Sequence, residues 1–509
     1  MDPSGTPAWD DHGVERGDLV IGADIGTTAA KAVVFDSSGA AHGQARREYP
    51  LDTSEPGRAE QGPEVVAEAS LATIREAAHG LDVAGICFSA AMHSLIGLDS
   101  AGRPLTPLLT WADTRAAHQA ERLRRESPEL HTLTGTPLHP MSPLAKLAWF
   151  AECDHETFAA VVRWVGIKEL VLHRLTGEWA IDRSCASGTG LQDMHRLDWS
   201  APALEAAGID ATKLAPAVDP GHRFELSAAG ATATGLPGGT PVVIGAGDGP
   251  LANLGVGAVR PGVAGCSIGT SGALRLAVET PAVDPGRRVF CYLLSEGRWV
   301  TGGAINNGGS VLGWAGRALA PDLGEHPEAA LLELAAQAPP GSEGLLMLPY
   351  LLSERAPHWS AVPRGAYVGL TTAHGRGHLV RAAIEGVCHQ LALVLESMRD
   401  AGNTVEAVRA TGGFARSELW CQMLADSLGL PIAFPASSEG SAFGAALLGM
   451  EALGIVESVA VAADLVPHGQ TIEPDVAAAA TYAEMRPVFA GLYESLEPAF
   501  RQLGAQALN

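Results

Sequence analysis

Two short turns rich in glycine and hydroxyl residues are the first candidates for chemistry in this sequence. Residues 24–28 read DIGTT, and residues 267–271 read SIGTS. A glycine between hydroxyl side chains lets backbone N–H groups converge on an anion, and the hydroxyl groups add further donors. Either turn alone is also compatible with an ordinary hairpin, but a matched pair about 240 residues apart predicts a clamp that holds a polyphosphate from two sides. The residues predicted to bind the phosphates are Thr27, Thr28, Lys31, Gly269, Thr270 and Ser271.

Two aspartates accompany these turns. Asp248 lies between glycines, directly after the β-rich run of residues 241–245, and Asp24 opens the first turn. Phosphoryl transfer needs a carboxylate near the acceptor hydroxyl to receive its proton, and acidic groups to hold Mg²⁺ or its water shell. An aspartate between glycines is also a common turn former. Its place ahead of the second turn favours Asp248 as the catalytic base, with Asp24 and Asp248 as the metal-binding pair.

A third group has the composition of a polyol pocket. Tryptophan and methionine suit the apolar face of a polyol, while histidine, arginine and lysine bind hydroxyl groups or a carboxylate. Each of these residues alone would more often be packing or a solvated charge. The predicted acceptor-binding residues are Met92, His93, Trp111, Arg115, Lys146 and Asp248. The glycines that would allow close approach of an adenosine are Gly412 and Gly413, followed by Phe414.

Two common nucleotide motifs do not fit. No Gly-x-x-x-x-Gly-Lys-Ser/Thr sequence occurs, which excludes a P-loop. Residues 245–249 (GAGDG) lack the full dinucleotide fingerprint and its βαβ context. Any phosphate site must therefore be built from the two hairpin turns.

The elements that must position these residues alternate between strands and helices, as in α/β domains. Each turn lies between two β-rich runs, so each predicts a hairpin. Apolar residues recur at helical spacing over residues 377–399, and residues 417–428 predict a second helix. From about residue 455 the chain is alanine-rich and predicted to be helical. The predicted division is a mobile leader (residues 1–16), a first domain with the acceptor (17–258), and a second, ATP-binding domain with a helical C-terminal extension (259–509).

Length, composition and net charge restrict the classes of protein to which this chain can belong. With 509 residues, of which 47% are hydrophobic, the chain suits two globular domains. A formal charge of −23 argues against a nucleic-acid partner and requires a local basic cluster for any anionic substrate. No apolar run reaches the ~18 residues of a membrane span, so we predict a cytoplasmic protein without a membrane partner. The oligomeric state is left open, with a homodimer as one alternative.

The pattern resembles the FGGY carbohydrate kinases of the actin-like ATPase superfamily, over residues 18–455. Two signature-like stretches carry the resemblance: residues 142–150 (SPLAKLAWF) and residues 365–370 (GAYVGL), continued at 378–379 and 382–385. Within the family the chain is most similar to gluconate kinases. The similar stretches are residues 92–96 (MHSLI), 110–115 (TWADTR), 138–144 (LHPMSPL), 247–253 (GDGPLAN), 302–309 (GGAINNGG) and 349–357 (PYLLSERAP). Ser94 stands where members that use other sugars usually have glycine.

The resemblance implies an α/β fold with two RNase H-like (actin-like ATPase) domains around a central cleft, and use of ATP with Mg²⁺. It implies phosphorylation of a small sugar acid or polyol, most simply D-gluconate to 6-phospho-D-gluconate. From charge alone, Arg115 and Lys146 are the predicted partners of the gluconate carboxylate. Two alternatives remain: a kinase for another polyol or ketose, such as xylulose or glycerol, and a non-catalytic actin-like nucleotide-binding module.

Overall fold

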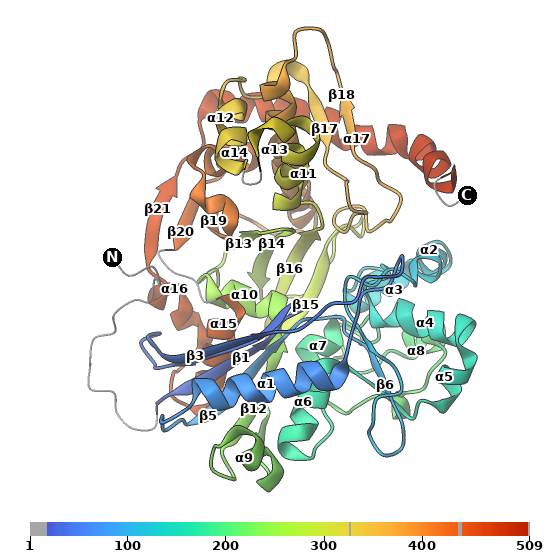
Figure 1. Ribbon diagram of the computed structural model, residues 1–509, viewed down its shortest axis with the longest axis vertical. Helices are drawn as coiled ribbons and strands as arrows, with labels where there is room; N and C mark the ends of the chain where they lie inside the picture. Colours follow the sequence, from blue (N-terminus) through green and yellow to red (C-terminus); the bar gives the residue numbers. More distant parts are fainter. Residues whose placement is uncertain (1–17, 325–326, 436–439, 507–509) are drawn as a thin grey trace.

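The computed structural model describes residues 18–324, 327–435 and 440–506. The predicted leader, residues 1–16, lies outside the described residues. The described chain forms two α/β domains, one in the lower and one in the upper half of Figure 1.

The first domain is built on a six-stranded sheet with the order β11–β12–β5–β1–β2–β3. Its strands are β1 (Val20–Ile25), β2 (Ala29–Phe35), β3 (Ala41–Glu48), β5 (Gly85–Ala90), β11 (Arg223–Glu225) and β12 (Pro241–Gly247). The β1–β2–β3 run is antiparallel, whereas β5 and β12 lie parallel to β1. Parallel neighbours need long crossover connections, and the helices of this domain lie in those connections.

The second domain repeats this arrangement in a seven-stranded sheet with the order β15–β16–β14–β13–β19–β20–β21. Its strands are β13 (Val263–Ile268), β14 (Gly272–Val278), β15 (Phe290–Ser295), β16 (Arg298–Ile305), β19 (Ala407–Thr411), β20 (Ile432–Pro435) and β21 (His468–Ile472). The β13–β14 hairpin is antiparallel and β19 lies parallel to β13, as β5 does to β1. The two sheets therefore agree with the duplication that the matched turns predicted.

Helices and short strands fill the connections. The helices of the first half are α1 (Pro63–Ala77), α2 (Ala117–Glu126), α3 (Glu129–Thr134), α4 (Pro143–Cys153), α5 (His155–Ala160), α6 (Ile167–Thr176), α7 (Arg183–Ser187), α8 (Ala201–Ala207), α9 (Ala228–Thr234) and α10 (Asp248–Gly255). Those of the second half are α11 (Gly309–Leu319), α12 (Glu328–Ala336), α13 (Arg376–Asp400), α14 (Glu418–Leu428), α15 (Gly440–Leu453), α16 (Ala462–Leu465) and α17 (Val476–Gln506). The two-stranded pairs are formed by β4 (Glu60–Gln61) with β7 (Leu108–Leu109), β6 (Ile96–Leu98) with β8 (Arg163–Val165), β9 (Ile181–Asp182) with β10 (Ala217–Val218), and β17 (Leu346–Leu348) with β18 (Ala366–Val368).

Helix α13 is the long helix that the apolar periodicity predicted. It has the length and hydropathy of a membrane span, but 89% of its most apolar window is buried inside the protein. A helix that is apolar on most of its circumference must be covered on all sides, and here protein covers it. It is therefore a core helix of the second domain.

Helix α15 comes from the second half of the sequence but packs on the first sheet, where its late-sequence colour lies among blue strands in Figure 1. Glycines make this close approach possible. A Cβ atom on Gly22 of β1 would lie 1.9 Å from the carbonyl oxygen of Ala442, and one on Gly444 would lie 2.2 Å from that of Leu251 in α10. Backbone thus packs directly on backbone at both contacts.

The C-terminal region differs in part from the prediction of a wholly helical extension. Helix α17 is present, but it is preceded by β21, which pairs antiparallel with β20. Alanine content predicted helix here, whereas the unpaired edge of β20 offers backbone donors and acceptors that a short strand satisfies. Apolar residues of α17, including Phe489 and Phe500, form a small core with Leu346 and Tyr350.

Candidate active site

The first predicted phosphate-binding turn, residues 24–28, closes the β1–β2 hairpin. The Gly26 N–H donates to the Ala29 carbonyl at 3.0 Å. Asp24 lies opposite Lys31 in the strand register, and its Oδ1 accepts a hydrogen bond from the Ser89 hydroxyl at 2.6 Å. Burial raises the pKa of Asp24, and these polar neighbours oppose that rise. The turn thus holds an enclosed carboxylate beside backbone donors.

The second predicted phosphate-binding turn, residues 267–271, closes the β13–β14 hairpin. The Gly269 N–H donates to the Ser271 carbonyl at 2.8 Å, and both Gly269 and Thr270 are exposed. Gly269 lines two cavities, one on each side of the turn. The backbone of this turn therefore forms part of the wall between the two cavities.

Asp248 lies where β12 ends and α10 begins. Its Oδ1 accepts hydrogen bonds from the N–H groups of Gly249 at 2.8 Å and Met92 at 3.3 Å. Burial and then the nearby Asp24 charge raise the pKa of Asp248 to about 6, while Arg275 works in the opposite direction. A carboxylate with this pKa is ionised at neutral pH and can accept a proton.

A buried polar brace holds the strand end below Asp248. The Lys168 ammonium donates to the Ala246 carbonyl at 2.9 Å and pairs with Asp182 at 2.6 Å, and both charged side chains are buried. The Ser184 hydroxyl accepts from the Gly247 N–H at 3.1 Å. These contacts fix the two residues that precede the candidate base.

A cavity of about 250 Å³ lies between the domains in front of Asp248. Its wall combines apolar rings, a few polar groups and the backbone of the second turn, as expected of a small-molecule site. It is lined by Met92, His93, Trp111, Met141, Asp248, Gly249, Ser267, Gly269, Ser271, Gly272, Ala273, Arg275, Phe290, Tyr292, Ala304, Arg355 and Trp359. Four predicted acceptor residues, Met92, His93, Trp111 and Asp248, are among them. We call this space the acceptor cavity.

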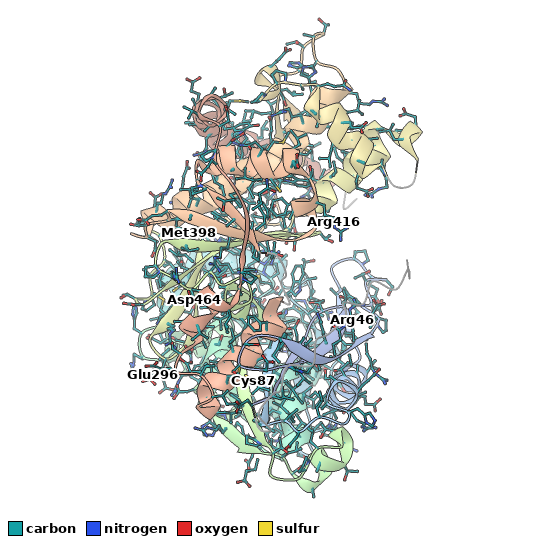
Figure 2. All side chains as sticks on the ribbon, turned by 90° about the vertical axis from the view of Figure 1, so that its left-hand side faces the viewer. Arg46, Cys87, Glu296, Met398, Arg416 and Asp464 are labelled. Carbon is teal, nitrogen blue, oxygen red and sulfur yellow. The ribbon has the colours of Figure 1, made fainter. Side chains whose placement is uncertain are left out.

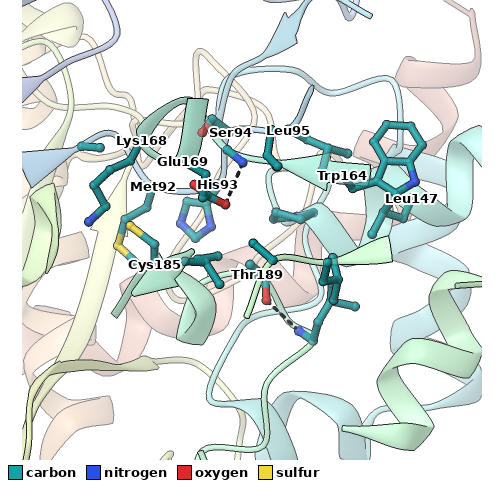
Figure 3. Close-up of a pocket in the computed structure, with 18 of the residues that line it drawn as sticks. Met92, His93, Ser94, Leu95, Leu147, Trp164, Lys168, Glu169, Cys185 and Thr189 are labelled. Carbon is teal, nitrogen blue, oxygen red and sulfur yellow. Dashed lines mark hydrogen bonds between the residues drawn. The ribbon is translucent and has the colours of Figure 1, made fainter. Parts of the chain in front are cut away.

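His93 presents one ring nitrogen to this cavity as an acceptor. Its Nδ1 lies 2.7 Å from the Gly188 carbonyl, which fixes that nitrogen as the donor and leaves Nε2 as the acceptor. Burial lowers the pKa of His93 to about 3, so the ring is neutral at physiological pH. Met92 and His93 also line a second, smaller cavity of about 40 Å³ behind them, where Glu169 lies close by (Figure 3).

Trp111 joins the acceptor cavity to the first phosphate turn. Its Nε1–H donates to the Thr27 hydroxyl at 2.9 Å. One face of its ring packs against the Arg355 guanidinium, 4.7 Å from the ring centroid. The indole is therefore held at its edge by one domain and on its face by the other.

Arg115 does not line the acceptor cavity. Its guanidinium pairs with Asp113 and Glu60, and it stacks on Trp149 at 5.2 Å. Because Arg115 lies outside the cavity wall, and its Nε and Nη2 donate to Asp113 and Glu60, the geometry gives no support to its predicted contact with a substrate carboxylate.

Lys146 also lies outside the wall of the acceptor cavity. It is fully buried, and its ammonium donates to the carbonyls of His93 at 2.6 Å and Thr110 at 2.8 Å. Burial lowers the pKa of Lys146 to about 7. The side chain thus supports the backbone that carries His93 and Trp111, which is an indirect role that the sequence alone did not predict.

Two arginines outside the predicted set, Arg275 and Arg355, line the acceptor cavity. Arg275 projects from β14 next to Asp248, and a Cβ atom on Gly249 would lie 3.7 Å from its Nε. Within residues 18–324, 327–435 and 440–506, its guanidinium has no hydrogen-bonding partner. Arg355 uses two of its N–H groups, on the Asn306 side chain and the Ile305 carbonyl.

Both arginines keep a positive charge in the cavity. Burial lowers the pKa of Arg355 to about 10, and it lowers the pKa of Arg275, which the Asp248 charge opposes. Both groups stay protonated at neutral pH. The local basic cluster that the overall charge demanded is therefore present, built from residues of the second domain.

A larger cavity of about 700 Å³ lies on the other side of the second turn. It is lined by Ile268, Gly269, Thr270, Gly309, Ser310, Leu312, Gly313, Glu328, Ala329, Leu332, Gly413, Phe414, Arg416, Ser417 and Trp420. The predicted Gly413 and Phe414 belong to its wall. Gly412, at φ 120°, packs on the backbone of Ile268. Arg416, labelled in Figure 2, projects from the second domain on the side that faces the first.

The two candidate metal-binding carboxylates belong to different elements of the first domain. Asp24 and Asp248 are near enough for the charge of one to raise the pKa of the other. Among the described residues there is no group of three or more His, Cys, Asp or Glu side chains that could enclose a metal ion. The pair fits a hard cation that takes its remaining ligands from phosphate and water.

Comparisons with known proteins settle the class. Residues 19–255 match the N-terminal domain of the FGGY family of carbohydrate kinases, and residues 264–453 match its C-terminal domain. The chain belongs to the FGGY family of carbohydrate kinases. It is 39% identical to a gluconokinase of Bacillus subtilis (strain 168), covering 95% of this chain and 97% of that protein. As an FGGY chain it is a carbohydrate kinase, and ATP is the family's phosphate donor.

Solved structures of family members superpose on nearly the whole length of this chain. Gluconate kinase from Lactobacillus acidophilus has a TM-score of 0.90 at 32% identity, with 95% of this chain and 99% of that chain covered. A ligand-bound xylulose kinase from the same organism has a TM-score of 0.91 at 33% identity, with the same coverage. The predicted fold class, two actin-like α/β domains around a cleft, is confirmed. The two structures differ in acceptor, so fold likeness leaves the substrate to the cavity itself.

Proposed function

We propose that this kinase transfers the γ-phosphoryl group of ATP to the 6-hydroxyl of D-gluconate, giving 6-phospho-D-gluconate in the cytoplasm. The observation that carries the proposal is the pair Arg275 and Arg355, which face the acceptor cavity with unused N–H donors. Two guanidinium groups against one carboxylate, Asp248, leave the cavity with an excess of positive charge. A sugar acid supplies the missing anion, whereas a neutral polyol does not.

The two arginines would divide the work along the acceptor. Arg275 lies beside Asp248, at the end where the reacting hydroxyl must be, whereas Arg355 lies against Trp111. A six-carbon acid with its 6-hydroxyl at Asp248 would place its carboxylate at Arg355. The Nε2 atom of His93 would accept a hydrogen bond from one of the hydroxyl groups between these ends.

The reaction then follows from the enclosed groups. The 6-oxygen forms a bond to the γ-phosphorus as the bond from phosphorus to the β–γ bridging oxygen breaks, Asp248 receives the hydroxyl proton, and ADP leaves. Mg²⁺, held through Asp24 and Asp248 with phosphate oxygens, would neutralise charge on the phosphates. Donors for the phosphates would come from Thr27, Thr28, Lys31, Gly269, Thr270 and Ser271. Gly412, Gly413 and Phe414 would border the adenosine.

A ketose kinase is the second candidate, because the xylulose kinase structure superposes as well as the gluconate kinase structure. Xylulose is neutral and would leave the unused donor of Arg355 without an anionic partner, whereas Arg275 already lies beside the Asp248 carboxylate. A non-catalytic nucleotide-binding module is not favoured, because such a protein needs no acceptor cavity beside a carboxylate.

The test is an acceptor panel of D-gluconate, D-xylulose, glycerol and D-glucitol, with ADP release as the measurement and ³¹P NMR to locate the new phosphate. D-Glucitol has the carbon chain of gluconate without its charge. Arg355→Met should lower kcat/KM for gluconate by about 10- to 150-fold, the effect of one lost hydrogen bond to a charged group. Arg364→Met, in the same loop region but outside the cavity wall, is the control. Preference for xylulose over gluconate, or an equal loss with gluconate and glucitol, would contradict the proposal.

A further inference from the structure

A buried glutamate links the two cavities that flank the second phosphate turn. Glu354 is fully buried. Its Oε1 accepts from the N–H groups of Asn306 at 2.7 Å and Arg355 at 2.8 Å, and its Oε2 accepts from the Asn307 side chain at 2.7 Å. One carboxylate therefore ties the loop that carries Arg355 to the residues that join β16 to α11.

On the acceptor side, the link ends at the guanidinium of Arg355. Its Nε–H donates to Asn306 Oδ1 at 2.7 Å, and its Nη2 donates to the Ile305 carbonyl at 3.0 Å. Asn307 contributes a second tie to the same loop, because its Oδ1 accepts from the Leu352 N–H at 2.9 Å. An anion that pulls on Arg355 thus acts on the Asn306–Asn307 backbone.

On the nucleotide side, the same short connection ends at the second phosphate turn. The Gly308 N–H donates to the Thr270 carbonyl at 3.1 Å, and the Gly309 N–H donates to the Gly269 carbonyl at 2.7 Å. The Ser310 N–H also donates to the Thr270 carbonyl, at 3.2 Å. Gly269, Thr270, Gly309 and Ser310 all line the cavity of about 700 Å³ on the other side of that turn, where the nucleotide is proposed to bind. The connection from β16 to α11 therefore touches Arg355 at one end and the phosphate-binding backbone at the other.

These hydrogen bonds do more than stabilise a single loop. A brace for one loop requires hydrogen bonds within that loop, whereas these bonds connect two loops that line different binding spaces. The three connecting residues, 306–308, leave little slack between the ends. A shift at Arg355 that moves the turn changes the affinity of the turn for phosphate, and by linkage phosphate binding then changes the affinity for the acceptor by the same factor.

We propose that Glu354, Asn306 and Asn307 are positioning residues that couple acceptor binding at Arg355 to the order of the phosphate turn at Gly269–Thr270. The inference rests on the proposed function in that it needs an acceptor that contacts Arg355. Its consequence is synergy: the acceptor tightens the binding of ATP, and ATP tightens the binding of the acceptor by the same factor. The phosphate turn reaches its productive arrangement when an acceptor is present, which limits phosphoryl transfer to water.

The experiment measures that factor by isothermal titration calorimetry. A non-hydrolysable ATP analogue with Mg²⁺ is titrated with and without the acceptor, and the acceptor is titrated with and without the analogue. We expect a reciprocal factor of about 5 or more in the full-length chain, in the usual range for coupled sites. In Glu354→Gln and in Asn306→Ala the factor should fall to below about 2, because the first change removes the charge that holds both loops and the second removes the acceptor of the Arg355 Nε–H.

Glu385→Gln is the matched control. Glu385 is also a buried glutamate of the second domain, but it binds Arg381, Ser342 and Tyr482, away from both cavities. It should keep the wild-type factor even if its melting temperature falls. Asn306 is partly exposed, so Asn306→Ala keeps the test available if Glu354→Gln does not fold.

The outcomes separate this inference from the choice of substrate. The titrations use whichever acceptor the panel shows to be phosphorylated, gluconate or another. If that acceptor is xylulose and the factor is still lost in Glu354→Gln and Asn306→Ala, the coupling stands and the gluconate assignment is wrong. A wild-type factor near 1, an unchanged factor in both variants, or an equal loss in Glu385→Gln would overturn the coupling itself.

Discussion

The charge of Arg275 should influence how the activity of this kinase depends on pH. Asp248 must be ionised to accept the hydroxyl proton, and its pKa is about 6. In the wild-type chain kcat/KM should therefore fall as pH drops through about 6, with about a tenth of the base ionised at pH 5. Arg275 lowers the pKa of Asp248, and burial and Asp24 raise it. Replacing the arginine by methionine removes the lowering effect and keeps the apolar bulk.

The size of the shift follows from this arrangement. An opposite charge within about 4–6 Å lowers a carboxyl pKa by about 1–3 units, so Arg275→Met should raise the pKa of Asp248 to about 7–9. At pH 7 the ionised fraction falls from about 0.9 to between about 0.5 and 0.01. We expect kcat/KM at pH 7 to fall by about 2- to 100-fold for this reason alone, and to recover most of that loss by pH 9.

The assay is a profile of kcat/KM from pH 5 to 9.5, with ADP measured by chromatography after quenching so that no coupling enzyme limits the ends of the range. Loss of a substrate contact would lower the whole curve, whereas loss of the charge moves its acid limb. Arg260→Met, which removes an exposed arginine paired with Asp464, controls for the change in net charge. An acid limb in Arg275→Met that stays within about 0.3 units of wild type would refute the reasoning.

Three further predictions concern the supporting structure. Lys168→Met leaves the buried Asp182 carboxylate without its partner and should cost about 3–5 kcal/mol in urea unfolding, whereas the double variant Lys168→Met/Asp182→Asn should recover part of that loss. Arg115→Met should leave the acceptor KM within about threefold of wild type while lowering stability by about 1–3 kcal/mol; a large rise in KM would restore Arg115 as a substrate contact. Gly444→Ala should cost about 1–3 kcal/mol or more by thermal unfolding, because the added methyl meets backbone, while Gly491→Ala in open space on α17 should be neutral or stabilising.

Local sequence patterns were enough to predict several elements of the fold. The two hairpins, α13 and α14 depend on short-range signals: glycine between strand-forming runs, and apolar residues at helical spacing. β21 was missed because its pairing partner, β20, lies far away in the sequence and its own residues carry a weak strand signal. An edge strand of this kind depends on what the rest of the sheet leaves unpaired.

The sequence predicted which kinds of side chain the candidate site needs. It predicted less well which individual residues supply them. Asp248, Met92, His93 and Trp111 follow strand ends or turns, so their approximate place could be inferred. Whether a cation is available to a substrate depends on its tertiary partners, and the local sequence does not show that Glu60 pairs with Arg115.

A signal for one of the missed arginines was nevertheless present in the sequence. Ala273, Arg275 and Ala277 alternate on one face of a strand whose other face, with Leu274 and Leu276, is core. A lone cation on the strand that follows a predicted phosphate-binding turn is therefore a candidate binding residue, and Arg275 does line the acceptor cavity. Arg355 lies in residues 349–357 (PYLLSERAP), one of the stretches similar to gluconate kinases, but the contacts of its loop with Glu354 and residues 306–307 are tertiary and have no local sequence signal.

The packing of α15 on the first sheet also bears on how the chain is made. The backbone contact between Gly22 and Ala442 joins residues about 420 positions apart. During synthesis, the first sheet emerges from the ribosome long before the helix that covers this part of its surface. Until residue 453 has been translated, that apolar surface lacks its native covering helix. The nascent first domain is therefore incomplete during this time, and its exposed surface can bind chaperones or aggregate. Cutting the gene at the boundary between the two sequence halves would make this state permanent. Two such fragments should therefore be poorly soluble alone and become a soluble kinase when co-expressed.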